Sequence, residues 1–150
     1  MFVTYFWEFI LCIFIAPAGV AKIAYRQYKN KEKLVKSGEK QLVIAAIFIF
    51  VFIILITDSE NVFNPLTYLY GSSGILAIVL GILMILKGKK YNKYKSAINN
   101  HNLYSINEIA KFMSLPKETV TKDLLDMIEG GLLPDLKYNR ETKKLELNAF

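Results

Sequence analysis

The stretch that decides the fold is residues 42–56, which reads LVIAAIFIFVFIILI. It contains no charged side chain, no hydrogen-bonding side chain, no proline and no glycine. With one residue added at each end it would extend about 25 Å as an α-helix, which covers most of the roughly 30 Å hydrocarbon core of a bilayer. Because apolar runs of this length are rare in soluble domains, we interpret residues 41–57 as a membrane-spanning helix.

Two more apolar stretches, residues 2–22 and 66–86, lie in the same chain and are interpreted as further membrane spans. The first contains Pro17, which removes one helical hydrogen bond and is expected to kink the helix. Its Ala16-Pro17-Ala18 loosely resembles a signal-peptidase site. Cleavage there would leave a basic segment outside the cell, so a retained helix is favoured.

The basic residues indicate how these spans are oriented. Lys and Arg number seven in residues 22–40, none in residues 58–67 and five in residues 87–95. The positive-inside rule then places the N-terminus outside, residues 22–40 inside, residues 58–67 outside and the rest in the cytoplasm of a bacterial cell. The natural partner of the basic segments is the anionic inner leaflet. The headgroup contacts that we expect are Lys22, Arg26, Lys29, Lys87, Lys89 and Lys90.

Two features of the spans raise functional alternatives. Glu8 is the only acid in an apolar segment and could be a proton or cation site, although its place near the outer end favours simple contact with headgroup water. Gly74, Ala77 and Gly81 form a small-residue stripe that permits close helix packing. The partner of this stripe is either another span of the same chain or a second copy, which would make a homo-oligomer.

Residues 89–150 predict a small soluble domain that follows the membrane region of residues 1–88. Residues 89–100 are expected to continue as a helix, and Ser105-Ile106-Asn107-Glu108 has the pattern of a capping box before a second, short helix. A third helix starts near Pro116 and ends at Gly130-Gly131, and residues 132–138 and 143–147 are predicted strands around a polar turn. The expected fold is therefore a membrane α-helical region of three transmembrane helices plus a small α+β winged-helix cytoplasmic domain.

The domain resembles a winged-helix, PCI-like module of Gram-positive bacteria, which is appended to small membrane proteins and to XpaC-like proteins. The resemblance covers about 55 residues, and it implies a domain used for protein contacts with no assigned catalytic residues. Its most specific part is the ending MIxxGLLP. The matching residues are Tyr94, Ile98, Ser105, Ile106, Glu108, Ile109, Ala110, Val120, Asp123, Leu124, Met127, Ile128, Gly131, Leu132, Leu133 and Pro134.

The sequence offers little for catalysis or for a cofactor. Cys12 is the only cysteine, which excludes an internal disulfide and argues against a thiolate metal site. His101 is the only histidine and lies among asparagines in an expected loop. No nucleophile with a base, no metal-ligand cluster and no phosphate-binding glycine loop is present in the sequence. We therefore predict a protein that is not an enzyme and needs no cofactor.

The third helix of the domain would be the DNA-reading helix of a winged helix. Residues 117–129 carry two lysines against four acids, and this net negative charge opposes contact with phosphates. We therefore expect a cytoplasmic or membrane protein as partner and regard DNA as an unlikely one. A membrane-tethered transcription regulator and a subunit of a transporter or immunity system are the alternatives. The docking residues that we predict are Lys117, Thr121, Lys122, Asp126 and Arg140.

Overall fold

The computed structural model describes the backbone of residues 2–57 and 64–147, and the side chains of residues 16–57 and 64–146. The chain divides into two compact units. The helical unit comprises Met1–Lys29 and Lys33–Leu86, and the tail domain comprises Asn30–Glu32 and Lys87–Phe150. The predicted division into residues 1–88 and 89–150 differs from this in its boundary and in the short segment Asn30–Glu32.

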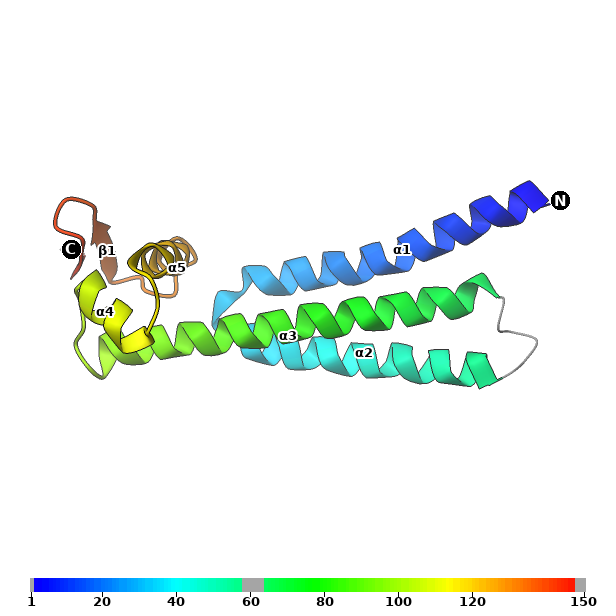
Figure 1. Cartoon of the computed structure of the whole chain (residues 1–150), viewed down its shortest axis with the longest axis horizontal. Coiled ribbons are helices and arrows are strands. Elements are labelled where there is room, and N and C mark those ends of the chain that lie inside the picture. Colours follow the sequence, from blue (N-terminus) through cyan, green and yellow to red (C-terminus); the bar gives the residue numbers. More distant parts are fainter. Residues whose placement is uncertain (1, 58–63, 148–150) are drawn as a thin grey trace. The chain divides into compact units, whose positions relative to one another are not determined.

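Three helices form the helical unit (Figure 1). Helix α1 (Phe2–Lys29) is followed by a short 3-10 turn η1 (Lys31–Lys33), by α2 (Leu34–Thr57) and by α3 (Pro65–Asn99), which belongs to this unit as far as Leu86. Val20 of α1, Ala45 of α2 and Ala77 of α3 meet in a small buried cluster. The three helices therefore pack around small side chains rather than around a large apolar core.

Glycines set the close approach of α2 and α3. A Cβ atom added at Gly38 would lie 2.6 Å from the carbonyl oxygen of Gly81, and one at Gly81 would lie 3.0 Å from that of Gly38. Gly74 similarly faces Ile49, and Ala77 is fully buried. The stripe Gly74, Ala77 and Gly81 thus lies against α2 of the same chain. Association of two copies through this stripe stays a prediction.

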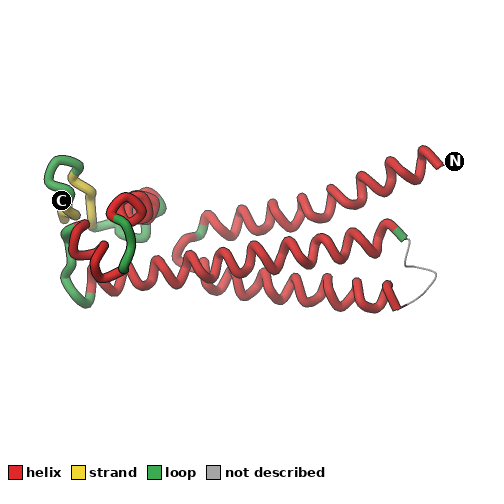
Figure 2. Tube along the Cα trace, viewed as in Figure 1, coloured by secondary structure: helices red, strands yellow, loops and turns green. Residues whose placement is uncertain are grey.

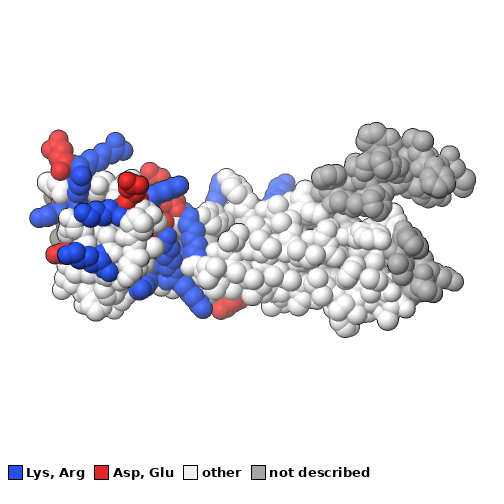
Figure 3. Space-filling view, in the orientation of Figure 1, with Lys and Arg blue, Asp and Glu red and all other residues white. Residues whose placement is uncertain are grey.

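Many large apolar side chains of the helical unit point outward instead of inward. Val43, Ile47 and Phe50 of α2 are 60–64% exposed, and Ile75 of α3 is 61% exposed. Only 11% of the most apolar window of α2 and 33% of that of α3 is buried. Figure 3 shows this face of the unit almost free of charged atoms along its middle. A soluble protein would bury such side chains, so this surface is suited to an apolar surrounding.

The prediction of three membrane-spanning helices is wrong. Among the described residues two helices are long and apolar enough to cross a membrane, Lys31–Thr57 and Pro65–Asn99. The described part of α1 carries Lys22, Arg26 and Lys29 and is not among these two helices. The predicted location of the N-terminus outside depended on the third span and loses its basis.

The tail domain contains the end of α3, two more helices and a hairpin (Figure 2). Helix α4 is Ile106–Met113 and α5 is Lys117–Glu129. Strands β1 (Leu136–Asn139) and β2 (Lys144–Leu147) pair antiparallel, with Tyr138 opposite Leu145. Both strands lie within or close to their predicted ranges. The end of α3 is one uninterrupted helix with the apolar segment, which confirms the continuing helix predicted over residues 89–100.

Apolar residues at helical spacing form the core of the tail domain. Ile106, Ile109 and Met113 face inward from α4, and Val120, Leu124 and Met127 face inward from α5. Both sets follow the i, i+3 or i+4, i+7 pattern seen in the sequence. The other buried residues of this core are Tyr91, Tyr94, Ala97, Ile98, Ala110, Leu132, Leu133, Leu136 and Leu145.

The helix ends of the domain confirm one prediction and overturn another. Gly131 has φ +70°, and the N–H of Leu132 donates to the carbonyl of Met127 over 2.9 Å, which is the glycine-dependent helix end expected there. The predicted capping box is wrong, because the Ser105 side chain makes no capping hydrogen bond. The backbone of Ser105 instead bridges to Lys144.

The winged-helix prediction is also wrong. In the described part of the chain the sheet has two strands. Where a winged helix has a third strand, this chain forms a single bridge between Ser105 and Lys144. The physical reason is the short connection from α3 to α4. Ser105 is already the N-cap of α4, so the pairing is limited to the two hydrogen bonds around this bridge. The N–H of Leu145 donates to the carbonyl of Tyr104 over 2.8 Å, and the N–H of Ile106 donates to the carbonyl of Lys143 over 3.4 Å.

Candidate docking groove

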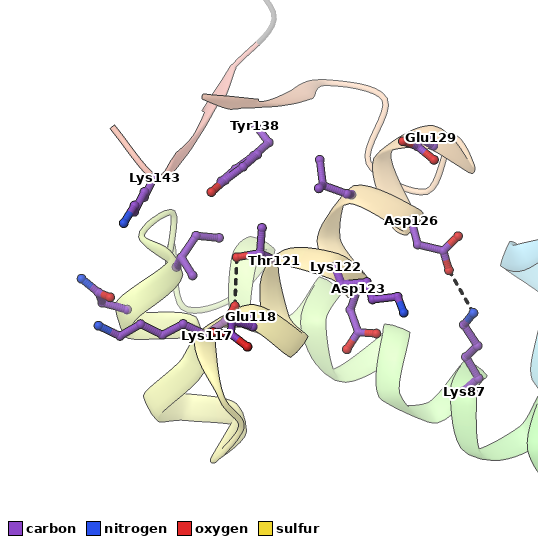
Figure 4. Close-up of a pocket in the computed structure, with 13 residues that line it drawn as sticks. Lys87, Lys117, Glu118, Thr121, Lys122, Asp123, Asp126, Glu129, Tyr138 and Lys143 are labelled. Atoms are coloured by element: carbon purple, nitrogen blue, oxygen red, sulfur yellow. Dashed lines mark hydrogen bonds and ion pairs between the residues drawn. The ribbon is translucent and has the colours of Figure 1, made fainter. Parts of the chain in front are cut away.

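A groove of about 930 Å³ runs along α5 in the tail domain (Figure 4). Helix α5 forms one side, and the start of α4 and the hairpin contribute Ile106, Asn107, Tyr138 and Lys143. In Figure 4 the ring of Tyr138 points from β1 into the groove. The charged side chains that line the groove are Lys87, Lys117, Glu118, Lys122, Asp123, Asp126, Glu129 and Lys143.

The amphipathic pattern of α5 explains why its polar residues reach this groove. Val120, Leu124 and Met127 are fully buried, which turns the opposite residues of the helix toward solvent. Thr121 is half-buried in the groove wall, and its hydroxyl donates to the carbonyl of Lys117 over 2.9 Å. Lys122 is exposed beside it. The outward face of α5 is therefore a polar wall with a fixed orientation.

Two carboxylates of α5 are held by the end of α3. Asp123 accepts a hydrogen bond of 2.9 Å from the hydroxyl of Tyr94 and pairs with Lys90 at 2.5 Å. These partners lie on one face of α3, because residues spaced three or four apart on a helix are neighbours. Asp123 therefore fixes α5 to α3 instead of facing a partner.

Asp126 forms the second and larger of these attachments. Its carboxylate pairs with Lys87 at 2.9 Å and also accepts hydrogen bonds from Lys31 and from the hydroxyl of Tyr91. The ammonium of Lys31 donates in addition to the carbonyl of Asp126 over 2.6 Å. The side chain of Lys31 passes close to Gly130, where a Cβ atom would lie 2.4 Å from its Cδ. The segment Asn30–Glu32 is thus tied to the last turn of α5.

The pKa values of this cluster follow from burial and hydrogen bonding. Burial alone would raise the pKa of Asp126, but hydrogen bonds from Lys31, Tyr91 and Lys87 outweigh it and hold the pKa of this carboxyl well below its usual range. Burial, and then the hydrogen bond to Asp126, raises the pKa of the Tyr91 hydroxyl well above its usual value. Asp126 is therefore ionised and Tyr91 neutral at physiological pH.

The remaining charges of the groove have no ion-pair partner among the described residues. They are the lysines Lys117, Lys122 and Lys143 and the glutamates Glu118 and Glu129. Both signs thus occur among these unpaired charges, with three lysines and two glutamates along one groove. Such a surface matches a ligand that itself carries both signs, which is typical of a polypeptide.

The predicted docking residues fall into three groups. Lys117, Thr121 and Lys122 line the groove. Asp126 lines it too, but its carboxylate is occupied by three partners inside the domain. Arg140 is exposed on the hairpin turn and does not line the groove. The structure brings the first four together on α5 and leaves Arg140 apart.

The predicted headgroup contacts also differ in their surroundings. Lys22, Arg26 and Lys29 of α1 and Lys89 of α3 are exposed. Lys87 and Lys90 instead pair with Asp126 and Asp123. The sequence interpretation assigned these two lysines to the lipid surface, whereas in the structure they pair with carboxylates inside the tail domain.

The other candidate site residues show no catalytic arrangement. The side chain of Glu8 lies outside the described residues, and so does that of Cys12. The ring of His101 packs against that of Phe112, with the centroids 5.0 Å apart and the planes tilted by 47°. No group of three or more potential metal ligands occurs among the described residues. The comparisons with known proteins add no family: no family model, characterised protein or solved structure matches the chain.

Sequence reasoning missed the partners that hold α5. The partners on α3 follow helical spacing i, i+3 or i+4, i+7, with Lys87 first, then Lys90 or Tyr91, and then Tyr94. On α5 the two carboxylates, Asp123 and Asp126, are three residues apart. Matching an Asp pair on one helix with a Lys/Tyr stripe on another would have suggested the contact. Nothing in the local pattern singles out Lys31, which is 95 residues from its partner along the chain.

Proposed function

We propose that this protein is a membrane-anchored docking protein. In this proposal α2 and the apolar part of α3 form a hairpin in the cytoplasmic membrane of a bacterial cell, and the tail domain binds a partner protein through its groove. The observation that carries the docking part is the groove along α5 with unpaired charges of both signs. The partner is a polypeptide segment that carries acidic and basic side chains.

Exposed apolar side chains support the anchor. Burying a large aliphatic or aromatic side chain is worth about 1.5–3 kcal/mol, and several residues on α2 and α3 are more than half exposed in the protein alone. A bilayer would cover them. The basic residues of the sequence support the orientation, because they gather in residues 22–40, up to the first turns of α2, and after the apolar part of α3, while the connection of residues 58–64 contains none.

The charge pattern of the groove favours a protein over a nucleic acid. Glu118 and Glu129 line the same groove as Lys117 and Lys122, so a uniformly negative backbone would meet like charge along its path. The net negative charge of α5 argues less strongly against DNA binding than the sequence suggested, because Asp123 and Asp126 pair with lysines within the domain. Tyr138 adds an aromatic side chain at the groove wall, a residue type that is enriched in protein hot spots.

Site-specific photocrosslinking tests the proposal. A photoreactive amino acid replaces Thr121 in the groove of the full-length chain, and a matched variant carries it at Lys137. Lys137 is exposed on β1, and it points to the opposite face of the hairpin from Tyr138 because side chains alternate along a strand. We expect a crosslinked protein in the membrane fraction from position 121 and none from position 137.

The charge of the groove provides the decisive comparison. With the crosslinked protein purified and the full chain in nanodiscs, Lys122→Glu should weaken binding about tenfold, and Lys137→Glu should leave it unchanged. Equal crosslinking from both positions would contradict the groove as the docking site. Salt-sensitive binding of duplex DNA by the full chain that Lys122→Glu abolishes would favour the membrane-tethered regulator instead.

A further inference from the structure

We infer that the helical unit binds an anionic phospholipid at a specific site, in the apolar groove between α1 and α3. One acyl chain lies in this groove, and the phosphate group is bound by the basic stripe of α1, which consists of Lys22, Arg26 and Lys29. This inference rests on the proposed membrane anchoring and goes beyond it, because it names a lipid class and a site.

The groove has a volume of about 270 Å³ and is almost wholly apolar. Helix α1 contributes Ala21, Ala24, Tyr25 and Tyr28 to it. Alanines leave the space that the groove occupies, and the two tyrosine rings form its wall. The volume is slightly below that of typical small-molecule pockets, so it suits a segment of an acyl chain rather than a whole ligand.

Helix α3 closes the other side with Leu80, Leu83 and Met84. These residues lie in the last apolar turns before the basic residues that start at Lys87. The groove therefore lies where the apolar part of α3 ends. Tyrosine side chains such as those of α1 are enriched at this level of a membrane, where the ring is in the acyl region and the hydroxyl reaches the headgroups.

The basic stripe borders the groove on α1. Helical spacing of 100° per residue places Lys22, Arg26 and Lys29 on one face, next to the face that lines the groove. All three side chains are exposed. The ammonium of Lys29 lies 5.3 Å from the ring centroid of Tyr25, which connects the two faces. Cations beside an apolar groove match a ligand with an anionic head and an apolar tail.

Charge decides between the occupants of this groove. A second copy of the chain would bring the same three cations to the same edge in a two-fold interface, and the like charges would repel. A zwitterionic lipid would fill the groove, but its headgroup has no net negative charge to balance the three cations of the basic stripe. The anionic phospholipid satisfies both the apolar groove and the basic stripe.

Native mass spectrometry tests the site. The full-length chain is reconstituted in vesicles of equal parts phosphatidylglycerol and phosphatidylcholine and then released with its bound lipid. We expect about tenfold or greater enrichment of phosphatidylglycerol over phosphatidylcholine, because each base near a lipid surface contributes to anion binding. Equal retention of the two lipids by the unaltered chain would overturn the inference.

Matched variants separate the acyl and phosphate parts of the site. Ala21→Trp fills the groove from its exposed rim and should abolish the retained lipid, whereas Ala46→Trp, at an exposed alanine of α2 away from the groove, should not. Changing Lys22, Arg26 and Lys29 to Gln should remove the lipid preference. The same change at Lys33, Lys36 and Lys40 removes equal charge from exposed positions outside the groove and should preserve it.

A separate measurement on the same vesicles tests whether the chain is anchored in the bilayer. Alkaline carbonate washing of the same vesicles shows whether the chain stays in the bilayer. A chain that washes off would overturn the anchoring proposal. A chain that stays in the bilayer, but in which Ala21→Trp retains as much phosphatidylglycerol as Ala46→Trp, would overturn the lipid site alone.

Discussion

Asp126 shows how a residue can have a different role from the one its position suggests. On the sequence it is an acidic residue on the outward face of a helix, and it was a natural docking residue. In the structure Lys31, Lys87 and Tyr91 bind its carboxylate. Its partners come from the distant segment Asn30–Glu32 and from α3, so local pattern alone does not reveal them. The exposed lysines Lys117 and Lys122 remain as candidates for recognition.

Replacing Asp126 with Asn tests this structural role. We expect the tail domain to lose about 1–2 kcal/mol of stability, since charge-assisted hydrogen bonds are lost but the carboxylate is 35% exposed and partly screened by solvent. Hydrogen exchange of the full chain should show faster exchange of the α5 amides. Glu129→Gln is the control, because Glu129 has no ion pair among the described residues. Unchanged exchange in Asp126→Asn would contradict the role.

The pH dependence of stability follows from the same carboxyl. Its pKa is lowered in the folded state, so its contribution is fully present above the unfolded value of about 4 and is lost as the pH falls through the folded value. Urea unfolding of the full chain in detergent, at pH values from 3 to 7, should show an acid decline below about pH 4. The decline should be shallower in Asp126→Asn. Identical acid declines would show that another group is responsible.

At the scale of elements, the contact between α2 and α3 depends on the absence of side chains. A valine at Gly38 would place its Cβ atom 2.6 Å from the carbonyl oxygen of Gly81, so the helices must separate. We expect Gly38→Val to cost about 1–3 kcal/mol, a typical value for overpacking, and to lower the thermal midpoint of the full chain in detergent. Gly19→Val controls for helix propensity, because a Cβ atom at Gly19 meets nothing within 4 Å. Equal effects of both changes would argue against the close contact.

Much of the element order could be predicted from the sequence. The apolar runs, the spacing of Ile106, Ile109 and Met113, and the Gly130-Gly131 stop all identify helices that the structure contains. These signals are local, and local hydrogen bonding and burial decide them. The winged-helix sheet could not be predicted reliably, because a third strand depends on how many residues before α4 pair with β2, and the pairing here is a single bridge at Ser105. That competition is decided by tertiary packing.

The membrane region shows the same division between local and tertiary information. Hydropathy identifies residues 41–57 and 66–86, and the structure adds that their large side chains face outward. The first apolar run was counted as a third span on length and hydropathy alone. In the described part of α1 the side chains form an apolar face and a basic face instead. The groove on α5 was only partly predicted, because Tyr138 and Lys143 reach it through the hairpin.

At the scale of the whole molecule, the proposed function requires a hairpin in the membrane and a domain in the cytoplasm. Alkaline-phosphatase fusions at Asn64 and at Lys95 test this most directly, because the enzyme is active only outside the cytoplasm. The account predicts an active fusion at Asn64, in the connection between α2 and α3, and an inactive one at Lys95. An inactive fusion at Asn64 together with an active one at Lys95 would contradict it.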